Sequence, residues 1–105
     1  MKHPYRAFLC LCVLLLFGLS APAHAGGDAE AGKAKSAKCT SCHGAAGKGT
    51  VAAPALAGKE AEYLVAAMKA YRDGKRQNPM MAMAVQGLSD ADIADLAAYF
   101  AAQAP

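Results

Sequence analysis

The chain has 105 residues with 11 basic and 8 acidic side chains, so its formal net charge is only +3. It contains no basic patch with interleaved aromatic residues, which argues against a nucleic-acid partner. Its length allows one small domain rather than several.

Residues 1–25 have the pattern of a secretory signal peptide. Two basic residues precede an uncharged run at 7–19, and Ala23-His24-Ala25 is a small-residue cleavage site. The run is shorter than the ~20 residues that a membrane-spanning helix needs, so we expect cleavage after Ala25 and export to the periplasm. Cys10 and Cys12 then leave with the signal, because no lipoprotein box precedes them.

The mature domain predicted by this cleavage is residues 26–105. The signal segment holds two basic residues and no acidic ones, so the net charge of the mature chain falls to +1. A domain of 80 residues buries a limited apolar core, and chains of this size often need disulfides, a metal or a bound cofactor for stability.

The elements predicted in residues 26–105 are all helical, beginning with a helix at 28–38. Helix-forming residues and an acidic first turn indicate this helix, and Gly32 is its one weak position. Residues 44–58 are rich in Gly, Ala and Pro and predict an irregular loop. A second helix follows at 59–73, with apolar side chains at helical spacing, and Gly74 stands where a left-handed cap is expected.

The last part of the chain predicts a loop and then the clearest helix. Residues 75–87 contain Pro79 and three methionines, and predict a loop with room for a short helical turn. Residues 89–103 predict a helix, in which Ser89 is the N-cap and Asp92 occupies the capping-box position.

The segment Cys39-Thr40-Ser41-Cys42-His43 carries the strongest functional signal. Two thiols at this spacing can each add to a haem vinyl group, and the adjacent imidazole can then bind the iron. His43 is the only histidine in residues 26–105, so one chain cannot supply two histidine ligands. A structural zinc site would need a fourth ligand beside these three. The motif therefore predicts one covalently bound haem c per chain.

A methionine thioether is the natural ligand for the opposite haem face, because it is soft and favours ferrous iron. Met68 lies in a predicted helix, where a methionine is more often part of the core. Pro79-Met80-Met81 lies in a segment able to cross the open haem face, and Met83 suits packing against the ring. The residues alone leave the choice between Met80 and Met81 open.

Taken together, residues 26–103 resemble a small bacterial class I cytochrome c of the c-553 type, and are similar to one half of the dihaem periplasmic cytochromes. The resemblance implies an all-α cytochrome c fold, with three main helices and loops wrapped around one covalently bound haem c. The residues that carry it are Gly32, Cys39 to Gly44, Pro54 to Gly58, Tyr63-Leu64, Arg72 through Arg76, Met80-Met81, and Leu88-Ser89-Asp90 to Ala98-Tyr99-Phe100.

The resemblance also implies roles for individual residues. The ligating methionine falls seven residues before Leu88, which implies Met81, with Met80 as the alternative. The carbonyl near Pro54 is implied as the partner of the other ring nitrogen of His43.

Further roles concern two arginines, one glycine and three lysines, and the charged residues have ordinary surface exposure as their alternative. Arg76, or less readily Arg72, suits a haem propionate, but a solvated surface arginine fits equally. Gly32 lets the first and last helices cross closely near Tyr99 and Phe100. Three lysines are either part of a docking rim or ordinary surface, namely Lys38, Lys48 and Lys59.

The predicted function is one-electron transfer between Fe(III) and Fe(II) by a monomeric periplasmic carrier that is not an enzyme. Its partners are a donor complex or dehydrogenase and a terminal acceptor, met in brief encounters that include membrane-bound complexes. The alternative is a cytochrome subunit of a periplasmic dehydrogenase complex. A thiol–disulfide oxidoreductase and a haem sensor or peroxidase with open iron are less favoured, because the cysteines follow a helix and two methionines are available as ligands.

Overall fold

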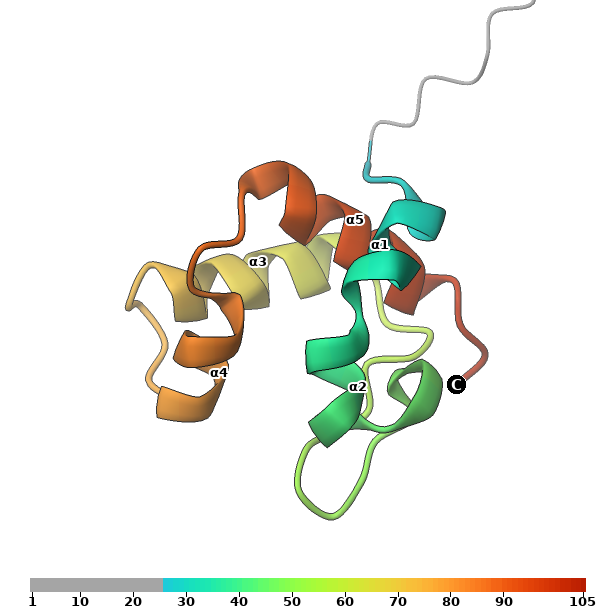
Figure 1. Ribbon diagram of the computed structural model, residues 1–105, viewed down its shortest axis with the longest axis horizontal. Helices are drawn as coiled ribbons and strands as arrows, with labels where there is room; N and C mark the ends of the chain where they lie inside the picture. Colours follow the sequence, from blue (N-terminus) through green and yellow to red (C-terminus); the bar gives the residue numbers. More distant parts are fainter. Residues whose placement is uncertain (1–25) are drawn as a thin grey trace, which may run out of the picture.

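The computed structural model describes residues 26–105, so the predicted signal segment 1–25 lies outside the described residues. Within 26–105 all regular structure is helical, and the predicted all-α fold is confirmed (Figure 1). The elements in chain order are α1 (Ala29–Lys35), α2 (Ala37–His43), the 3-10 turn η2 (Ala45–Gly47), α3 (Ala61–Arg72), α4 (Pro79–Val85) and α5 (Asp90–Ala101).

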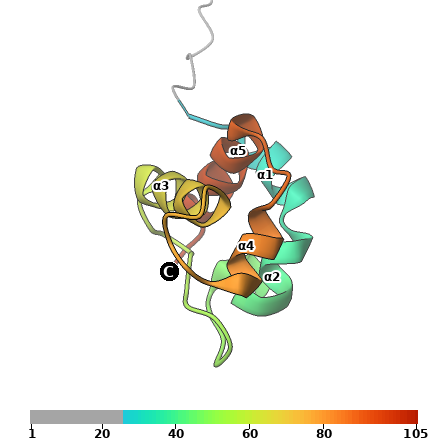
Figure 2. The ribbon, with the colours of Figure 1, turned by 90° about the vertical axis from the view of Figure 1, so that its left-hand side faces the viewer.

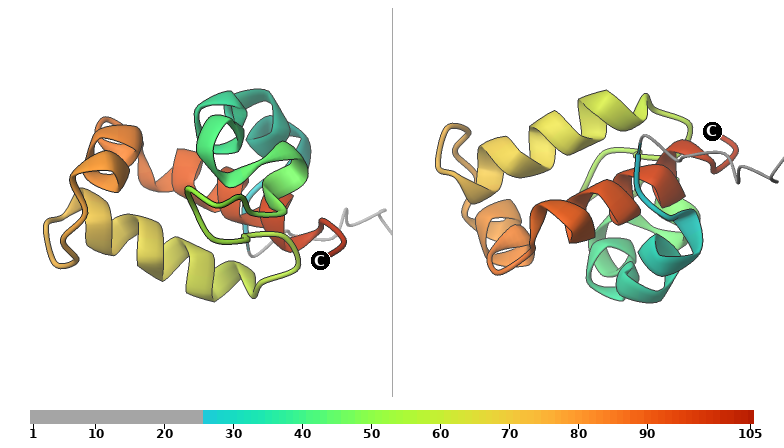
Figure 3. Two further views of the ribbon diagram at one scale, coloured as in Figure 1. Left: turned by 90° about the horizontal axis from the view of Figure 1, so that it is seen from below. Right: turned by 90° about the horizontal axis from the view of Figure 1, so that it is seen from above.

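Helix α5 lies between α3 and α1 and forms the centre of the fold (Figures 2 and 3). Its stripe of apolar residues is the most buried part of the molecule, because both neighbouring helices pack against it. The core cluster joins α3 to α5 and consists of Leu64, Leu96, Ala97 and Phe100. Burial of these side chains holds the layers together.

Helices α1 and α5 cross at Gly32, as the sequence predicts. A Cβ atom at position 32 would overlap the Asp95 carbonyl oxygen and lie 2.8 Å from the Tyr99 Cβ. Only glycine allows two helix backbones to approach this closely, because it has no side chain between them. The crossing fixes α1, and therefore the start of α2, relative to the core.

The helix predicted at 28–38 is divided in the structure and continues further along the chain. Asp28 accepts hydrogen bonds from the first-turn amides and caps α1, and the helix stops at Ser36. The buried Ser36 hydroxyl donates to the Lys33 carbonyl oxygen at 2.7 Å, which competes with the regular helical hydrogen bond. The chain then enters α2, so the two cysteines lie inside a helix rather than after one.

Residues 75–87, for which the sequence predicts a loop with room for a short helical turn, contain a longer helix than predicted. Residues 79–85 form α4, a helix of two turns. Asn78 caps it, since its Oδ1 accepts from the Met81 amide at 3.1 Å. Pro79 occupies the first turn, where its fixed φ suits a helix and its missing N–H costs nothing.

The ends of α3 and α5 match the sequence closely. Gly74 has a φ of +76° directly after α3, in the left-handed conformation that the sequence predicts there. At the start of α5, the Ser89 hydroxyl accepts from the Asp92 amide at 3.0 Å and the Asp92 carboxylate accepts from the Ser89 amide at 3.1 Å. The predicted capping box is therefore present, with Asp in place of Glu.

The contact between α1 and α5 should be sensitive to acid. Lys35 pairs with Asp92 at 2.9 Å and with Asp95 at 2.6 Å, and the Lys35 ammonium and the Ser89 amide lower the pKa of Asp92 to about 2. A carboxyl group with a depressed pKa stabilises the folded state above its usual pKa near 4. That stabilisation is lost as the pH falls from about 4 to about 2.

We therefore expect Asp92→Asn to be less stable than wild type at pH 6 and to lose less stability between pH 4 and pH 2. Urea denaturation of the haem-loaded protein across this range measures both quantities. Lys35→Met should flatten the profile in the same way, because it removes the shared cation. Parallel pH profiles for all three proteins would show that these pairs do not contribute.

Candidate haem-binding site

Helix α2 carries both predicted thioether cysteines and the predicted histidine ligand. Cys39 is half-buried against the core cluster, whereas Cys42 is exposed one turn later. Burial raises the pKa of the Cys39 thiol, and the charge of Lys38 partly offsets this effect. His43 ends the helix with only 6% of its surface exposed. One short helix thus presents two thiols and a buried imidazole together.

The His43 ring is held by a single short hydrogen bond. Its Nδ1 lies 2.6 Å from the Pro54 carbonyl oxygen. A carbonyl oxygen only accepts, so in the neutral imidazole Nδ1 carries the proton and Nε2 has the lone pair. The structure therefore brings together the two residues that the family resemblance pairs, and leaves Nε2 as the nitrogen able to bind a metal.

Thr50, for which the sequence predicts no role, positions the loop that supplies the Pro54 carbonyl. Its hydroxyl donates to the Cys42 carbonyl oxygen at 2.6 Å, at the end of α2. The same hydroxyl accepts from the amides of Ala52 and Ala53 at 3.1 and 3.3 Å. One side chain thus ties the loop to the haem motif. A threonine among glycines and alanines is the only signal for it in the sequence.

Thr50→Val should lower the free energy of unfolding by about 1 kcal/mol. The substitution keeps the shape of the side chain but removes the hydroxyl and its three hydrogen bonds. Amide hydrogen exchange at Ala52 and Ala53 should accelerate, which NMR measures residue by residue. Thr40→Val is the matched control, since the Thr40 hydroxyl donates only weakly, at 3.3 Å, within its own helix. Equal effects of the two substitutions would contradict this role of Thr50.

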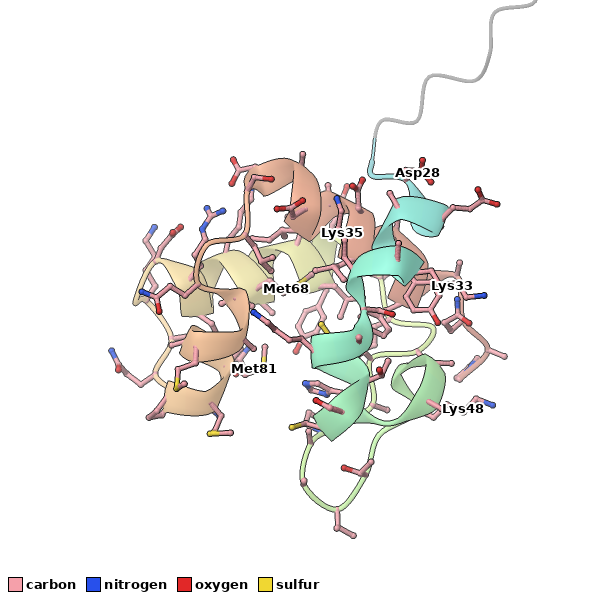
Figure 4. The ribbon with its side chains drawn as sticks, in the orientation of Figure 1. Asp28, Lys33, Lys35, Lys48, Met68 and Met81 are labelled. Carbon is pink, nitrogen blue, oxygen red and sulfur yellow. The ribbon has the colours of Figure 1, made fainter. Side chains whose placement is uncertain are left out.

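The four methionines of the described chain differ sharply in burial. Met80 and Met83 are each 70% exposed, Met81 is half-buried, and Met68 is half-buried against the core cluster. Figure 4 shows Met81 on the side of α4 that faces α2. Met81 therefore lies on the side of α4 from which a thioether can approach a group held by α2.

The two arginines considered for a propionate have protein partners. Arg72 Nη1 donates to Asp90 Oδ1 at 2.8 Å and to the Leu88 carbonyl oxygen at 3.2 Å, so it joins the end of α3 to the start of α5. Arg76 is exposed, with its guanidinium 5.0 Å from the ring centre of Tyr71. The three lysines predicted for a docking rim are all exposed, namely Lys38, Lys48 and Lys59.

The donor set suits a haem c better than a bare metal ion. Residues 26–105 contain no cluster of three or more His, Cys, Asp or Glu side chains arranged to hold a metal. The site instead offers two thiols, one oriented imidazole and a thioether from another helix, which are the groups that attach and ligate a haem c. No helix among the described residues is long and apolar enough to span a bilayer.

Comparison with known proteins gives the same result. The family model described as "Cytochrome c" matches residues 29–103. Cytochrome c4 of Pseudomonas aeruginosa is 48% identical over 96 residues, which cover 90% of this chain and 48% of the relative. Cytochrome c-554(548) of Halomonas halodenitrificans is 48% identical over 81 residues, covering 73% of this chain and 98% of the relative. The chain spans about half the length of the cytochrome c4 that it matches.

A solved structure of thiosulfate dehydrogenase from Marichromatium purpuratum superposes with a TM-score of 0.71 and 32% identity, over 81% of this chain and 21% of that one. The predicted fold and the predicted cofactor, a covalently bound haem c, are therefore confirmed. The oriented His43, the adjacent cysteines and the matched residues lead to one conclusion: the chain belongs to the cytochrome c family.

Proposed function

We propose that this protein is a periplasmic one-electron carrier, with Cys39 and Cys42 as the thioether residues and His43 and Met81 as the axial ligands of its haem. The observation that carries the proposal is the 2.6 Å hydrogen bond from His43 Nδ1 to the Pro54 carbonyl oxygen. It holds a buried imidazole with its free nitrogen available, which a metal ligand requires.

Bound haem c supplies a one-electron couple at the iron, and the residues of the chain set its conditions. The Pro54 carbonyl fixes the orientation of His43 and raises the basicity of its Nε2. A Met81 thioether would favour the reduced state and raise the potential. If His43 and Met81 both bind the iron, no coordination position would remain for a substrate, and the protein would pass electrons without making bonds.

Burial favours Met81 over Met80 as the sixth ligand. The two residues are adjacent in α4 and point about 100° apart around the helix axis. Met80 is 70% exposed, whereas Met81 is half-buried. Coordination by Met80 would require α4 to rotate, which would expose the Val85 side chain that it now buries.

Export is the second part of the proposal, with a signal peptide at residues 1–25 and a mature domain at 26–105. Intact mass spectrometry of the protein purified from the periplasm should give a chain beginning at Gly26 with one haem attached. A mass that retains residues 1–25 would contradict cleavage after Ala25.

The carrier role is tested by a potentiometric titration and by carbon monoxide. A six-coordinate carrier should titrate as a single one-electron couple, and carbon monoxide should leave the spectrum of the reduced protein unchanged. Immediate binding of carbon monoxide would show an open iron and favour a sensor or a peroxidase instead. The Met81→Ala variant serves as the positive control, because it should bind carbon monoxide.

A second candidate function is the cytochrome subunit of a dehydrogenase complex. The observation behind it is the superposition on part of a thiosulfate dehydrogenase, with a TM-score of 0.71, whereas the cytochrome c4 relatives favour the carrier. Tagged protein expressed in its own host should then co-purify with a catalytic chain in a fixed ratio. Elution at the mass of this chain alone, with full redox activity, would favour the free carrier.

A further inference from the structure

The segment that carries Met81 is joined to the rest of the fold by few polar contacts. Residues 73–89 leave the end of α3, form α4 below it and return to α5 (Figure 1). The backbone hydrogen bonds of residues 78–88 are all local to that stretch. One side chain from another part of residues 26–105 donates a hydrogen bond to it, because Arg72 Nη1 lies 3.2 Å from the Leu88 carbonyl oxygen.

Arg72 binds both ends of this segment. It is the last residue of α3, and its Nε donates to Asp73 Oδ1 at 3.0 Å, where the segment begins. Its Nη1 donates to Asp90 Oδ1 at 2.8 Å and to the Leu88 carbonyl oxygen, where the segment ends. A planar guanidinium presents several donors in fixed directions, so it can hold these acceptors together. One side chain therefore closes the segment at its base.

The position of α4 depends on how its ends are held. The helix has only seven residues, which is too short to be stable by itself in water. Apolar packing supplies part of the attachment, because Val85 is buried and Leu88 packs against the core cluster. Such packing is not directional, whereas the hydrogen bonds of Arg72 fix the end of the segment at one place.

We propose that Arg72 is a positioning residue for Met81, which holds the 73–89 segment closed and so limits how often the Met81 thioether leaves the haem iron. The inference rests on the proposed function, because it requires Met81 as the sixth ligand. Opening of α4 does not require α1, α3 and α5 to unfold. Loss of Arg72 should therefore release the ligand more often even where the overall fold is kept.

The test is the rate at which imidazole displaces the methionine from the ferric, haem-loaded protein. Imidazole binds only after the bond between iron and sulfur has opened, so the rate at saturating imidazole measures the opening. Stopped-flow absorbance follows it. Arg72→Met should accelerate displacement about tenfold, because it removes hydrogen bonds made by a charged group. Asp90→Asn should accelerate it about threefold, because Arg72 keeps its bond to the Leu88 carbonyl oxygen.

The matched control is Lys35→Met, which breaks ion pairs elsewhere on α5. Lys35 pairs with Asp92 at 2.9 Å and with Asp95 at 2.6 Å, and its side chain is 36% exposed, against 22% for Arg72. These pairs join α1 to α5 and leave residues 73–89 untouched, so displacement should stay within about twofold of wild type. Equal acceleration in Lys35→Met and Arg72→Met would show that displacement only follows overall stability, and would overturn the proposal.

Amide hydrogen exchange measures the opening of α4 without reference to the iron. The amides of Ala82 and Gln86 donate within α4, at 2.8 and 3.0 Å, and should exchange faster in Arg72→Met. The Ile93 amide of α5 is the internal reference and should keep its wild-type rate. Faster displacement without faster exchange at the two α4 amides would contradict an action through α4.

An unchanged displacement rate in Arg72→Met overturns the proposal. If that variant does not fold, an unchanged rate in Asp90→Asn does so instead. The proposed function fails separately, because a wild-type ferric protein without the near-infrared band of methionine ligation has no Met81 bond to displace. A wild type with this band and an unaffected Arg72→Met protein refutes only the positioning role of Arg72.

Discussion

Gly32→Ala is expected to lower the free energy of unfolding of the haem-loaded protein by about 3 kcal/mol. The new methyl group would overlap the Asp95 carbonyl oxygen and lie 2.6 Å from the carbonyl carbon. These are backbone atoms of α5 and cannot rotate away, so α1 must move off α5. The shift would propagate to α2, which follows α1 after one residue and carries Cys39.

Denaturant unfolding followed by circular dichroism measures this loss. Gly26→Ala is the control, because a Cβ atom at Gly26 meets nothing within 4 Å, and its effect should stay within about 0.5 kcal/mol. In a helix interior, alanine is otherwise more favourable than glycine. A Gly32→Ala protein as stable as wild type would show that the two helices do not need this close crossing.

Phe100→Ala is expected to cost about 3–5 kcal/mol, the usual range for removing a buried aromatic side chain. Phe100 is 1% exposed and belongs to the core cluster between α3 and α5. Its ring also packs directly against Gly47, where a Cβ atom would lie 2.6 Å away. The Gly47 carbonyl oxygen accepts from the amides of Leu56 and Ala57, so this ring supports the loop that holds His43.

The substitution should therefore affect both stability and the haem site. Besides the lower free energy of unfolding, we expect faster hydrogen exchange at the Leu56 and Ala57 amides. Tyr63→Ala is the control, because Tyr63 is 53% exposed, and it should cost less than about 1 kcal/mol. A loss of stability without faster exchange at these two amides would contradict the claim that the Phe100 ring supports the loop that holds His43.

Features set by local chemistry could be predicted from the sequence. The capping box of Ser89 and Asp92 and the left-handed Gly74 follow rules that act within a few residues. The haem motif is equally local, because its cysteines and histidine lie within five residues of one helix. The crossing at Gly32 is a contact between distant segments, and the prediction of it came from the family resemblance rather than from local rules.

Other features depend on contacts that the sequence does not display. Ser36 divides the first helix because its hydroxyl finds a backbone acceptor, a choice common to buried serines but not obligatory. Asn78 and Pro79 begin α4, but a proline within a methionine-rich segment predicts a loop as readily as a helix start. Arg72 reaches Asp90, 18 residues away, and Thr50 reaches Cys42 across a loop. Such pairs appear only once the fold has brought the segments together.

The most direct test of the central claim is the near-infrared absorption of the ferric protein, in wild type, Met81→Ala and Met80→Ala. A histidine and methionine pair at ferric iron gives a weak band in this region. We expect the band in wild type and in Met80→Ala, and its loss in Met81→Ala with the covalent haem retained. A wild type without the band, or a band that disappears in Met80→Ala and persists in Met81→Ala, would contradict ligation by His43 and Met81.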